Sequence, residues 1–412
     1  MTLFYIFACL VFLGIVVIAL QNLAIRSSIP KNQIIPESDF LAGEMTWRKN
    51  ISPKQSLNGF SPPTSILKPL KGLDDDLFDN LVSFCNQDYA EHEIIFALED
   101  KNDPALKLAQ KIKKQHPHQK ISIIVKQKDR ALNPKVNNMF SAYRISQFPY
   151  VLISDSDVRV DKDYLMTIGQ YMEDPHVGLV CNLIRGIGSR TIGSLFENLH
   201  LNSFVIGNIA ILSRFIKMPV VVGKSMLMRK EALEEIGGFE AVQNVLAEDY
   251  VMGDLMHRRG KKVITSGHII NAVNHNRTMM QFLKRHARWG KMRFKLGGIG
   301  YVSEILSNTV FIACLSLAVV GPTTGTIFLT STASLATIIG NYCLGKRIGS
   351  AHRFYHYLLS PLKDIIIGVI WFFPFFSRTV MWRKHKYKIA QGSVLIPLHA
   401  KGVQQESPLK NL

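Results

Sequence analysis

The chain has 412 residues, a formal net charge of +18, 47% hydrophobic residues and 19% charged residues. This hydrophobic content excludes a disordered chain and fits a mixture of globular and membrane-embedded segments. Because the sequence carries no zinc-finger or RNP signature, nucleic-acid binding explains the positive charge less well than a surface lying on anionic lipid or the attraction of an anionic substrate.

The first 25 residues contain no charged side chain. About 20 apolar residues suffice to cross a bilayer, so residues 1–25 are predicted to span a membrane. No basic residue precedes this segment, whereas Arg26 and Lys31 follow it. A cleaved signal peptide would begin with positive charge, so we expect an uncleaved anchor whose following domain lies in the cytoplasm. Residues 26–60 contain three prolines and are predicted to be a linker.

Short apolar runs rich in β-formers alternate with helical stretches between residues 64 and 180. They predict strands over 64–68, 93–98, 121–125 and 150–154, and helices near 75–87, 104–115, 135–147 and 162–173. This alternation is typical of an α/β fold with an open, mostly parallel sheet that is covered on both faces. In such sheets, ligands bind beyond the carboxyl ends of the strands.

Acidic residues gather where these strands end. Asp100 follows the second strand, and Asp155 and Asp157 follow the fourth in the stretch "VLISDSDVRV". Turns and helix caps also favour Ser and Asp, but Asp161 or Asp163 can cap the next helix without the pair. Two carboxylates two residues apart can jointly hold Mg²⁺ or Mn²⁺, which often bridges to substrate phosphates. Asp157 is the preferred direct ligand.

Two further positions stand at predicted helix starts and have two interpretations each. Lys135, behind a proline, is either a phosphate contact at a helix N-terminus or a solvated surface lysine. Glu248 and Asp249 begin an amphipathic helix, where an acidic residue is commonly a cap. The functional alternative is that Asp249 is a general base that takes a proton from an acceptor hydroxyl.

The rest of the chain has membrane character. Residues 279–300 predict a basic, amphipathic interfacial helix, in which Arg288 and Trp289 could close over a diphosphate. Residues 301–345 predict a transmembrane hairpin that breaks at 321–325. Residues 346–412 hold a shorter apolar run at 365–377, which indicates a short or re-entrant segment, and a basic tail. The α/β domain is assigned residues 61–278.

These motifs together resemble a known family. The series Asp100, Asp155-x-Asp157, Glu248-Asp249 and Arg285-x-x-Arg288-Trp289 is similar to the D, D-x-D, (E)D and (Q/R)xxRW series of membrane-associated, family 2-like glycosyltransferases. Segments such as "SILKPLKG", "NPKVNNM" and "GKSMLMRKEALEEIGGF" resemble the ceramide glucosyltransferase family, family 21, in particular. The segments "GLVCNLIRG", "IGGFE" and "RHARW" are also similar to bacterial hopanoid-linked N-acetylglucosamine transferases.

The resemblance implies a GT-A catalytic domain with a Rossmann-like sheet on the cytoplasmic face of a membrane, in a multi-pass protein of a bacterial inner membrane. The expected reaction is inverting transfer of glucose or a similar hexose from a UDP-sugar to a lipid hydroxyl, with ceramide as the favoured acceptor and a hopanoid as the alternative.

Residue roles also follow from the resemblance. Nucleotide-sugar binding falls to Asp100, Lys135 and Asp155, and Asp155 with Asp157 would hold a divalent cation. Asp249 would be the base, and the acceptor and diphosphate side would be formed by Glu248, Arg285, Arg288 and Trp289.

Two alternatives of other classes remain. The D-x-D pair is also the nucleophile motif of phosphatases that form an aspartyl-phosphate on the first aspartate, here Asp155. A non-catalytic membrane scaffold is the other alternative. Neither explains why acidic residues follow several strands or why a basic Arg-Trp helix precedes the membrane segments.

Overall fold

The computed structural model describes residues 1–29, 34–41, 60–126, 129–382 and 385–398. Much of the predicted linker and of the basic tail lies outside these residues. The chain divides into two compact units. We call residues 39–184 and 216–273 the sheet unit, and residues 1–38, 185–215 and those from 274 onward the membrane unit.

The sheet unit is built on an eight-stranded sheet with the order β3-β2-β1-β4-β7-β6-β8-β5. Its strands are β1 (Thr64–Leu70), β2 (His92–Leu98), β3 (Lys120–Val125), β4 (Tyr150–Ser154), β5 (Val158–Arg159), β6 (Val177–Ile187), β7 (Ser225–Arg229) and β8 (Lys262–Val273). The first four pair in parallel, as the alternating pattern predicts. On the other side, β7 runs antiparallel to both β4 and β6, and β5 runs antiparallel to β8.

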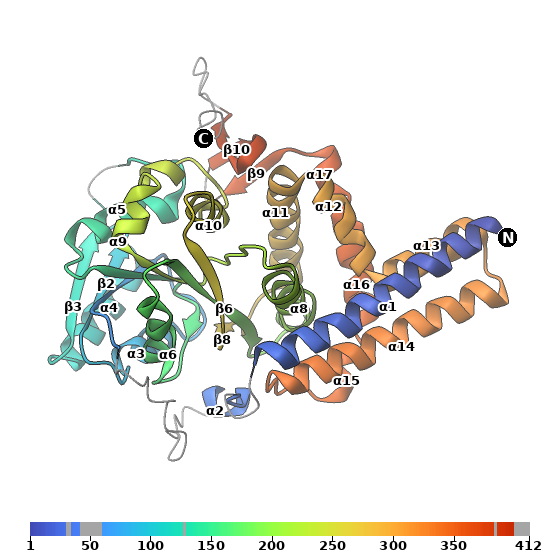
Figure 1. The fold of residues 1–412 in the computed structure, drawn as a ribbon, viewed down its shortest axis with the longest axis horizontal. Coiled ribbons are helices and arrows are strands. Elements are labelled where there is room, and N and C mark those ends of the chain that lie inside the picture. The colour runs from blue at the N-terminus through green and yellow to red at the C-terminus, as the bar shows by residue number, and fades with distance from the viewer. Residues whose placement is uncertain (30–33, 42–59, 127–128, 383–384, 399–412) are drawn as a thin grey trace. The chain divides into compact units, whose positions relative to one another are not determined.

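Helices link and cover these strands (Figure 1). They are α3 (Leu77–Cys85), α4 (Ala105–Gln115), α5 (Pro134–Ile145), α6 (Tyr164–Gly169), α9 (Lys230–Glu235) and α10 (Glu248–Arg258), with 3₁₀ turns η2 (Gln170–Glu173) and η5 (Glu240–Val242). The helix α4 buries Ala105, Ala109 and Ile112, which share one face at helical spacing. The side chain of Asn133 caps α5 by accepting from the backbone N–H groups of Lys135 and Val136.

The register of the sheet decides which loops meet at its carboxyl edge. Leu70 at the end of β1 pairs with Leu98 at the end of β2, and Ile153 of β4 pairs with Leu67 of β1. Because β7 is antiparallel to β4, its first residue Ser225 pairs with Ser154, the last residue of β4. The residues just before β7 therefore join the loops that follow the parallel strands. The expected α/β class is confirmed, and a ligand site at this edge stays a prediction.

The membrane unit is mostly helical. It contains α1 (Thr2–Ser28), α7 (Ile192–His200), the π turn η3 (Leu201–Val205), α8 (Ile206–Ile211), the π turn η4 (Leu212–Ile216), α11 (Met279–Gly297), α12 (Ile299–Ser303), η6 (Glu304–Ser307), α13 (Thr309–Val320), α14 (Thr324–Arg347), α15 (Phe354–Tyr357), α16 (Ser360–Trp371) and α17 (Phe373–Phe376). A small sheet of β9 (Thr379–Trp382), β10 (His385–Ile389) and β11 (Leu395–Pro397) follows, with the turn η7 (Gln391–Ser393). The short α2 (Glu37–Leu41) spans the boundary between the two units at residues 38 and 39. Figure 1 shows α1 running alongside α13 and α14.

Four helical stretches among the described residues are long and apolar enough to cross a membrane: Thr2–Ser28, Ile192–Ile216, Thr324–Arg347 and Phe354–Phe376. A fifth candidate is the pair Gly300–Ser307 and Thr309–Val320, which bends by 85°. The last of the four begins eleven residues before the charge-free run at 365–377 and includes Lys363 and Asp364, so it is longer than the short segment that this run indicates. The stretch Ile192–Ile216 was not predicted from the sequence.

Candidate active site

A buried lysine donates hydrogen bonds to the turn that carries the two aspartates. Lys68 of β1 has no exposed surface, and its ammonium donates to the backbone carbonyl of Asp155 at 2.7 Å and to Ser154 Oγ at 3.2 Å. It also lies 3.7 Å from the centre of the Phe84 ring. Burial lowers the pKa of Lys68 to about 7. Lys68 thus fixes the backbone of the turn, and its side chain does not face solvent.

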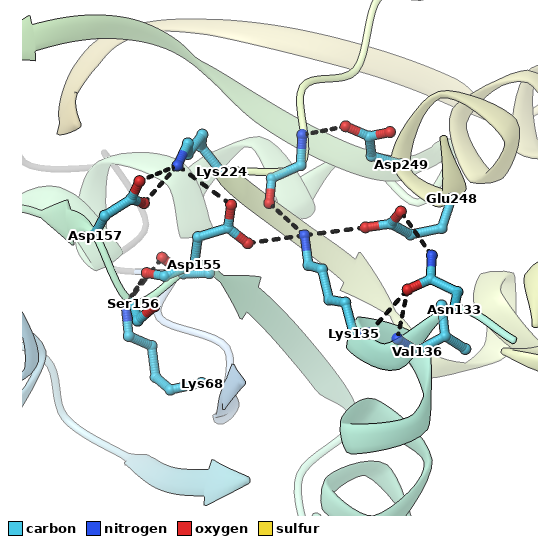
Figure 2. Close-up of polar contacts among 12 residues, drawn as sticks. Lys68, Asn133, Lys135, Val136, Asp155, Ser156, Asp157, Lys224, Glu248 and Asp249 are labelled. Carbon is cyan, nitrogen blue, oxygen red and sulfur yellow. Dashed lines mark hydrogen bonds and ion pairs between the residues drawn. The ribbon is translucent and has the colours of Figure 1, made fainter. Parts of the chain in front are cut away.

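A second lysine lies between the two aspartate side chains (Figure 2). Lys224 precedes β7, and its Nζ is 2.5 Å from both carboxylate oxygens of Asp157 and 3.4 Å from Oδ2 of Asp155. The antiparallel pairing of β7 with β4 brings it there. Neither Lys224 nor Lys68 was predicted from the sequence as a site residue.

A third lysine joins this pair to the Glu248-Asp249 motif. Lys135, in the first turn of α5, has its Nζ 2.8 Å from Oδ1 of Asp155, 3.1 Å from Oε1 of Glu248 and 3.0 Å from the carbonyl oxygen of Gly223. Burial alone would lower its pKa, but the carboxylates of Asp155 and Glu248 outweigh burial and raise it. Its side chain is only 18% exposed, so it does not match the solvated surface lysine.

The lysines also govern the ionisation of Asp155. Burial would favour the neutral acid, but the ammonium groups of Lys135 and Lys224 hold the pKa of Asp155 well below its usual range. The carboxylate therefore stays charged at neutral pH.

The pKa of Asp249 is shifted in the opposite direction from that of Asp155. Its Oδ2 accepts from the backbone N–H of Gly223 at 2.6 Å, and its Oδ1 accepts from the N–H of Tyr250 at 2.8 Å. Burial and the neighbouring Glu248 raise the pKa of Asp249 to about 6. The N-cap residue of α10 is Ala247, and Asp249 lies inside the first turn. An oriented carboxylate with a pKa near 6 suits general-base chemistry at neutral pH.

The motif partner Glu248 is turned toward the protein interior. Its Oε1 pairs with Lys135, and its Oε2 accepts from Asn133 Nδ2 at 3.0 Å. Since Asn133 caps α5, Glu248 ties the start of α5 to the start of α10. These contacts give Glu248 a positioning role, and a contact with the acceptor stays a prediction.

The other four predicted site residues lie on other elements of the chain. Asp100 is exposed at the end of β2, where its Oδ1 accepts from the backbone N–H of Asn102 at 2.8 Å. The other three, Arg285, Arg288 and Trp289, lie on α11 in the membrane unit. Their roles toward the nucleotide, the acceptor and the diphosphate stay predictions.

Within the membrane unit, one residue of the Arg-x-x-Arg-Trp motif pairs with a fully buried carboxylate. The Nε of Arg285 is 3.2 Å from Oε1 of Glu197, and the guanidinium lies 4.4 Å from the centre of the Trp289 ring. His286 and Arg277 face the same carboxylate at 3.2 Å and 3.9 Å. Glu197, on α7, was not singled out from the sequence.

The Asp155 and Asp157 carboxylates fit a divalent cation. The ammonium of Lys224 lies against both of them and is a stand-in for a bound cation. Among the described residues, no cluster of three or more His, Cys, Asp or Glu side chains could hold a metal. Two carboxylates suit a hard cation such as Mg²⁺ or Mn²⁺, which commonly completes its coordination with water and substrate phosphates.

Comparisons with known proteins agree with this geometry. The family model described as "Glycosyl transferase family 21" matches residues 39–395 of the chain. Ceramide glucosyltransferase 1 of Caenorhabditis elegans is 28% identical in an alignment of 361 positions that covers 80% of this chain and 72% of the nematode protein. Ceramide glucosyltransferase 3 of the same nematode is 27% identical in an alignment of 348 positions that covers 82% of this chain and 74% of that protein.

A solved structure with the same fold is the mannosyltransferase PcManGT from Pyrobaculum calidifontis in complex with GDP-Man and Mn²⁺. It superposes with a TM-score of 0.50 at 15% identity and covers 88% of this chain and 98% of its own. At this identity the likeness shows the fold alone, and it confirms the expected GT-A class.

Proposed function

The chain belongs to glycosyl transferase family 21, and we propose that it transfers a hexose from a UDP-sugar to the hydroxyl of a membrane lipid. The observation that carries the proposal is a continuous series of ion pairs (Figure 2). Lys224 pairs with Asp157 and Asp155, and Lys135 pairs with Asp155 and Glu248. Next to this series, the Asp249 carboxylate accepts a hydrogen bond from the backbone N–H of Gly223. The two ammonium groups beside the Asp155 and Asp157 carboxylates and a base of raised pKa therefore lie in one unit of the protein.

In the proposed reaction, the lipid hydroxyl attacks the anomeric carbon of the sugar while Asp249 takes the hydroxyl proton. The bond between the anomeric carbon and the diphosphate oxygen breaks on the opposite side, and UDP leaves. Since one displacement occurs, the configuration at the sugar carbon is inverted. Lys135 places positive charge beside the diphosphate site, which stabilises the leaving group.

Asp155 and Asp157 would hold a divalent cation on the donor diphosphate. When bound, Mg²⁺ or Mn²⁺ neutralises the charge that develops on the leaving group. The GT-A neighbour with Mn²⁺ and a nucleotide sugar supports this assignment.

Two relatives named ceramide glucosyltransferases favour glucose as the sugar and ceramide as the acceptor. The hopanoid acceptor with N-acetylglucosamine is retained as the second candidate, because "GLVCNLIRG" and "RHARW" resemble that branch. Because the chain belongs to a glycosyltransferase family, we no longer consider the two alternatives from other classes, an aspartyl-phosphate phosphatase and a non-catalytic scaffold.

The long apolar helices of the membrane unit support a lipid as the acceptor. Removing an acyl chain from a bilayer costs about 0.8 kcal/mol per CH₂, so transfer at the membrane surface is favoured over extraction of the lipid. Residues 1–25 carry no charged side chain and Arg26 lies in the last turn of α1, a pattern that favours a cytoplasmic catalytic domain, and we assign the protein to a bacterial inner membrane.

The test is a substrate panel with purified full-length protein in lipid nanodiscs. UDP-glucose, UDP-galactose and UDP-N-acetylglucosamine are each offered with ceramide, a hopanoid polyol or diacylglycerol, and products are read by mass spectrometry. We expect a glycosylated lipid only when a divalent cation is present. The proposal fails if no UDP-sugar yields a lipid product, or if Asp249→Asn transfers as fast as the wild type.

A further inference from the structure

The position of Lys224 conflicts with the cation that Asp155 and Asp157 are proposed to bind. Its ammonium contacts both oxygens of Asp157 at 2.5 Å and faces Asp155 at 3.4 Å. The Lys224 side chain is 11% exposed and that of Asp157 is 17% exposed, so solvent screens the pair only weakly. Mg²⁺ needs oxygen ligands at about 2.0–2.1 Å, and an ammonium cannot share those oxygens in the same place.

Lysine can resolve this conflict by moving. Its ammonium is a compact charge on a flexible four-carbon stem, with donors that can be redirected. Lys224 precedes the first residue of β7, so its side chain can turn without breaking the ladder that begins at Ser225. In the proposed donor complex, the strongest new anion near such a turn would be the diphosphate, which the cation on the same carboxylates would hold.

The charge balance of the cluster points the same way. Asp155 and Asp157 already face Lys224, and Asp155 also faces Lys135. A divalent cation alone would lie beside the ammonium groups of Lys224 and Lys135, which repel it. A diphosphate places negative charge beside both the cation and the ammonium groups, so cation and donor should favour each other's binding.

We propose that Lys224 is a donor-binding residue that occupies the cation position of Asp155 and Asp157 in the donor-free protein and moves onto the diphosphate when cation and nucleotide bind. The second half rests on the proposed function, since it assumes a nucleoside diphosphate donor. The consequence is that the cation binds weakly by itself and strongly with the nucleotide.

The experiment measures Mn²⁺ binding by electron paramagnetic resonance on full-length protein in detergent, with and without UDP. Lys224→Met keeps much of the side-chain volume and removes the charge. The matched control is Lys71→Met, because Lys71 pairs with Glu99 at 3.0 Å in the same unit and its side chain is 50% exposed. Circular dichroism checks folding, and Lys224→Gln serves as a second variant if Lys224→Met does not fold.

Removing a like charge a few ångströms from the cation should tighten Mn²⁺ binding without UDP by about tenfold or more in Lys224→Met. UDP should strengthen Mn²⁺ binding strongly in the wild type and much less in this variant. UDP binding in EDTA should weaken about tenfold in Lys224→Met, and the control should match the wild type throughout.

Unchanged or weaker Mn²⁺ binding in Lys224→Met without UDP would overturn the inference, as would an equal gain in the Lys71→Met control. Metal-independent transfer by the wild type would also overturn it, because Lys224 would then be the permanent cation of the site. If UDP bound neither protein, the proposed donor would fail, yet the Mn²⁺ comparison would still decide whether Lys224 occupies the cation position.

Discussion

Replacing Asp249 by Asn should make the enzyme more stable and nearly inactive. The amide keeps the size of the side chain but cannot take a proton. A positioned general base contributes about 10²–10⁴-fold to a rate, so transfer should fall by that factor. UDP and Mn²⁺ binding should persist, because the Asp249 carboxylate accepts hydrogen bonds from the backbone N–H groups of Gly223 and Tyr250 and is not one of the proposed cation ligands.

The gain in stability follows from the pKa of Asp249, which rises from 3.8 to about 6 on folding. The folded protein holds the proton more tightly than the unfolded chain, so the free energy of unfolding falls as pH rises from about 4 to about 6. At about 1.4 kcal/mol per pKa unit, the ionised carboxylate costs about 3 kcal/mol at neutral pH. Asn removes this cost but loses one hydrogen bond to an ionised acceptor, worth about 1.5–3 kcal/mol.

The net expectation is a stabilisation of about 1 kcal/mol, or a few degrees in unfolding temperature for a unit of this size. Thermal unfolding of purified Asp249→Asn is compared with the wild type at pH 7.5 and pH 4, together with transfer rates. The gain should be present at pH 7.5 and absent at pH 4, where wild-type Asp249 is largely protonated. An equal gain at both pH values, or a wild-type rate without an acid limb near pH 6, would refute the reasoning.

Three more substitutions test the contacts around this base. A Cβ on Gly223 would lie 2.8 Å from Oδ2 of Asp249 and 3.0 Å from Nζ of Lys135, so Gly223→Ala should lower transfer about tenfold or more with circular dichroism unchanged. The Lys135 cation lowers the pKa of Asp249, so Lys135→Met should move the acid limb of the pH–rate profile to higher pH, and an unmoved limb would show that the two are uncoupled. Glu197→Gln removes the buried partner of Arg285 and should cost about 3–5 kcal/mol, seen as a lower unfolding temperature with UDP binding retained; an unchanged temperature would count against the pair.

The parallel half of the sheet was predictable because its signals are local. Each of β1 to β4 is a short apolar run bounded by polar or turn-forming residues, and the alternation with helices fixes the class. The rule that parallel strands end at one edge then predicted that Asp155 and Asp157 lie at the carboxyl edge of the sheet, where they follow β4.

Local sequence patterns did not predict the positions of Lys224 and Lys68. Lys224 reaches the site only because β7 pairs antiparallel with β4, a contact between segments about seventy residues apart that no local pattern encodes. Lys68 could have been noticed in the sequence, because it is a charged residue within the apolar run "SILKPL". Such a residue is either buried with a partner or lies on an open face of the sheet.

The stretch Ile192–Ile216 escaped prediction for a related reason. Polar residues such as Glu197, Asn198 and Asn202 interrupt its hydropathy, and all three are buried in the membrane unit. Asn202 satisfies the backbone of Gly186 with both groups of its amide. Polar side chains with internal partners lower the apolar content of a helix without exposing it, so composition alone underestimates such a segment.

The central claim is that Asp249 drives a single displacement on a UDP-sugar held at Asp155 and Asp157. Its most direct test is the anomeric configuration of the first lipid product formed by the wild-type enzyme from α-linked UDP-glucose, measured by NMR of the isolated glycolipid. We expect a β-linked product, formed about 10²–10⁴-fold more slowly by Asp249→Asn. An α-linked product would contradict it, because retention requires a second displacement that a single base does not provide.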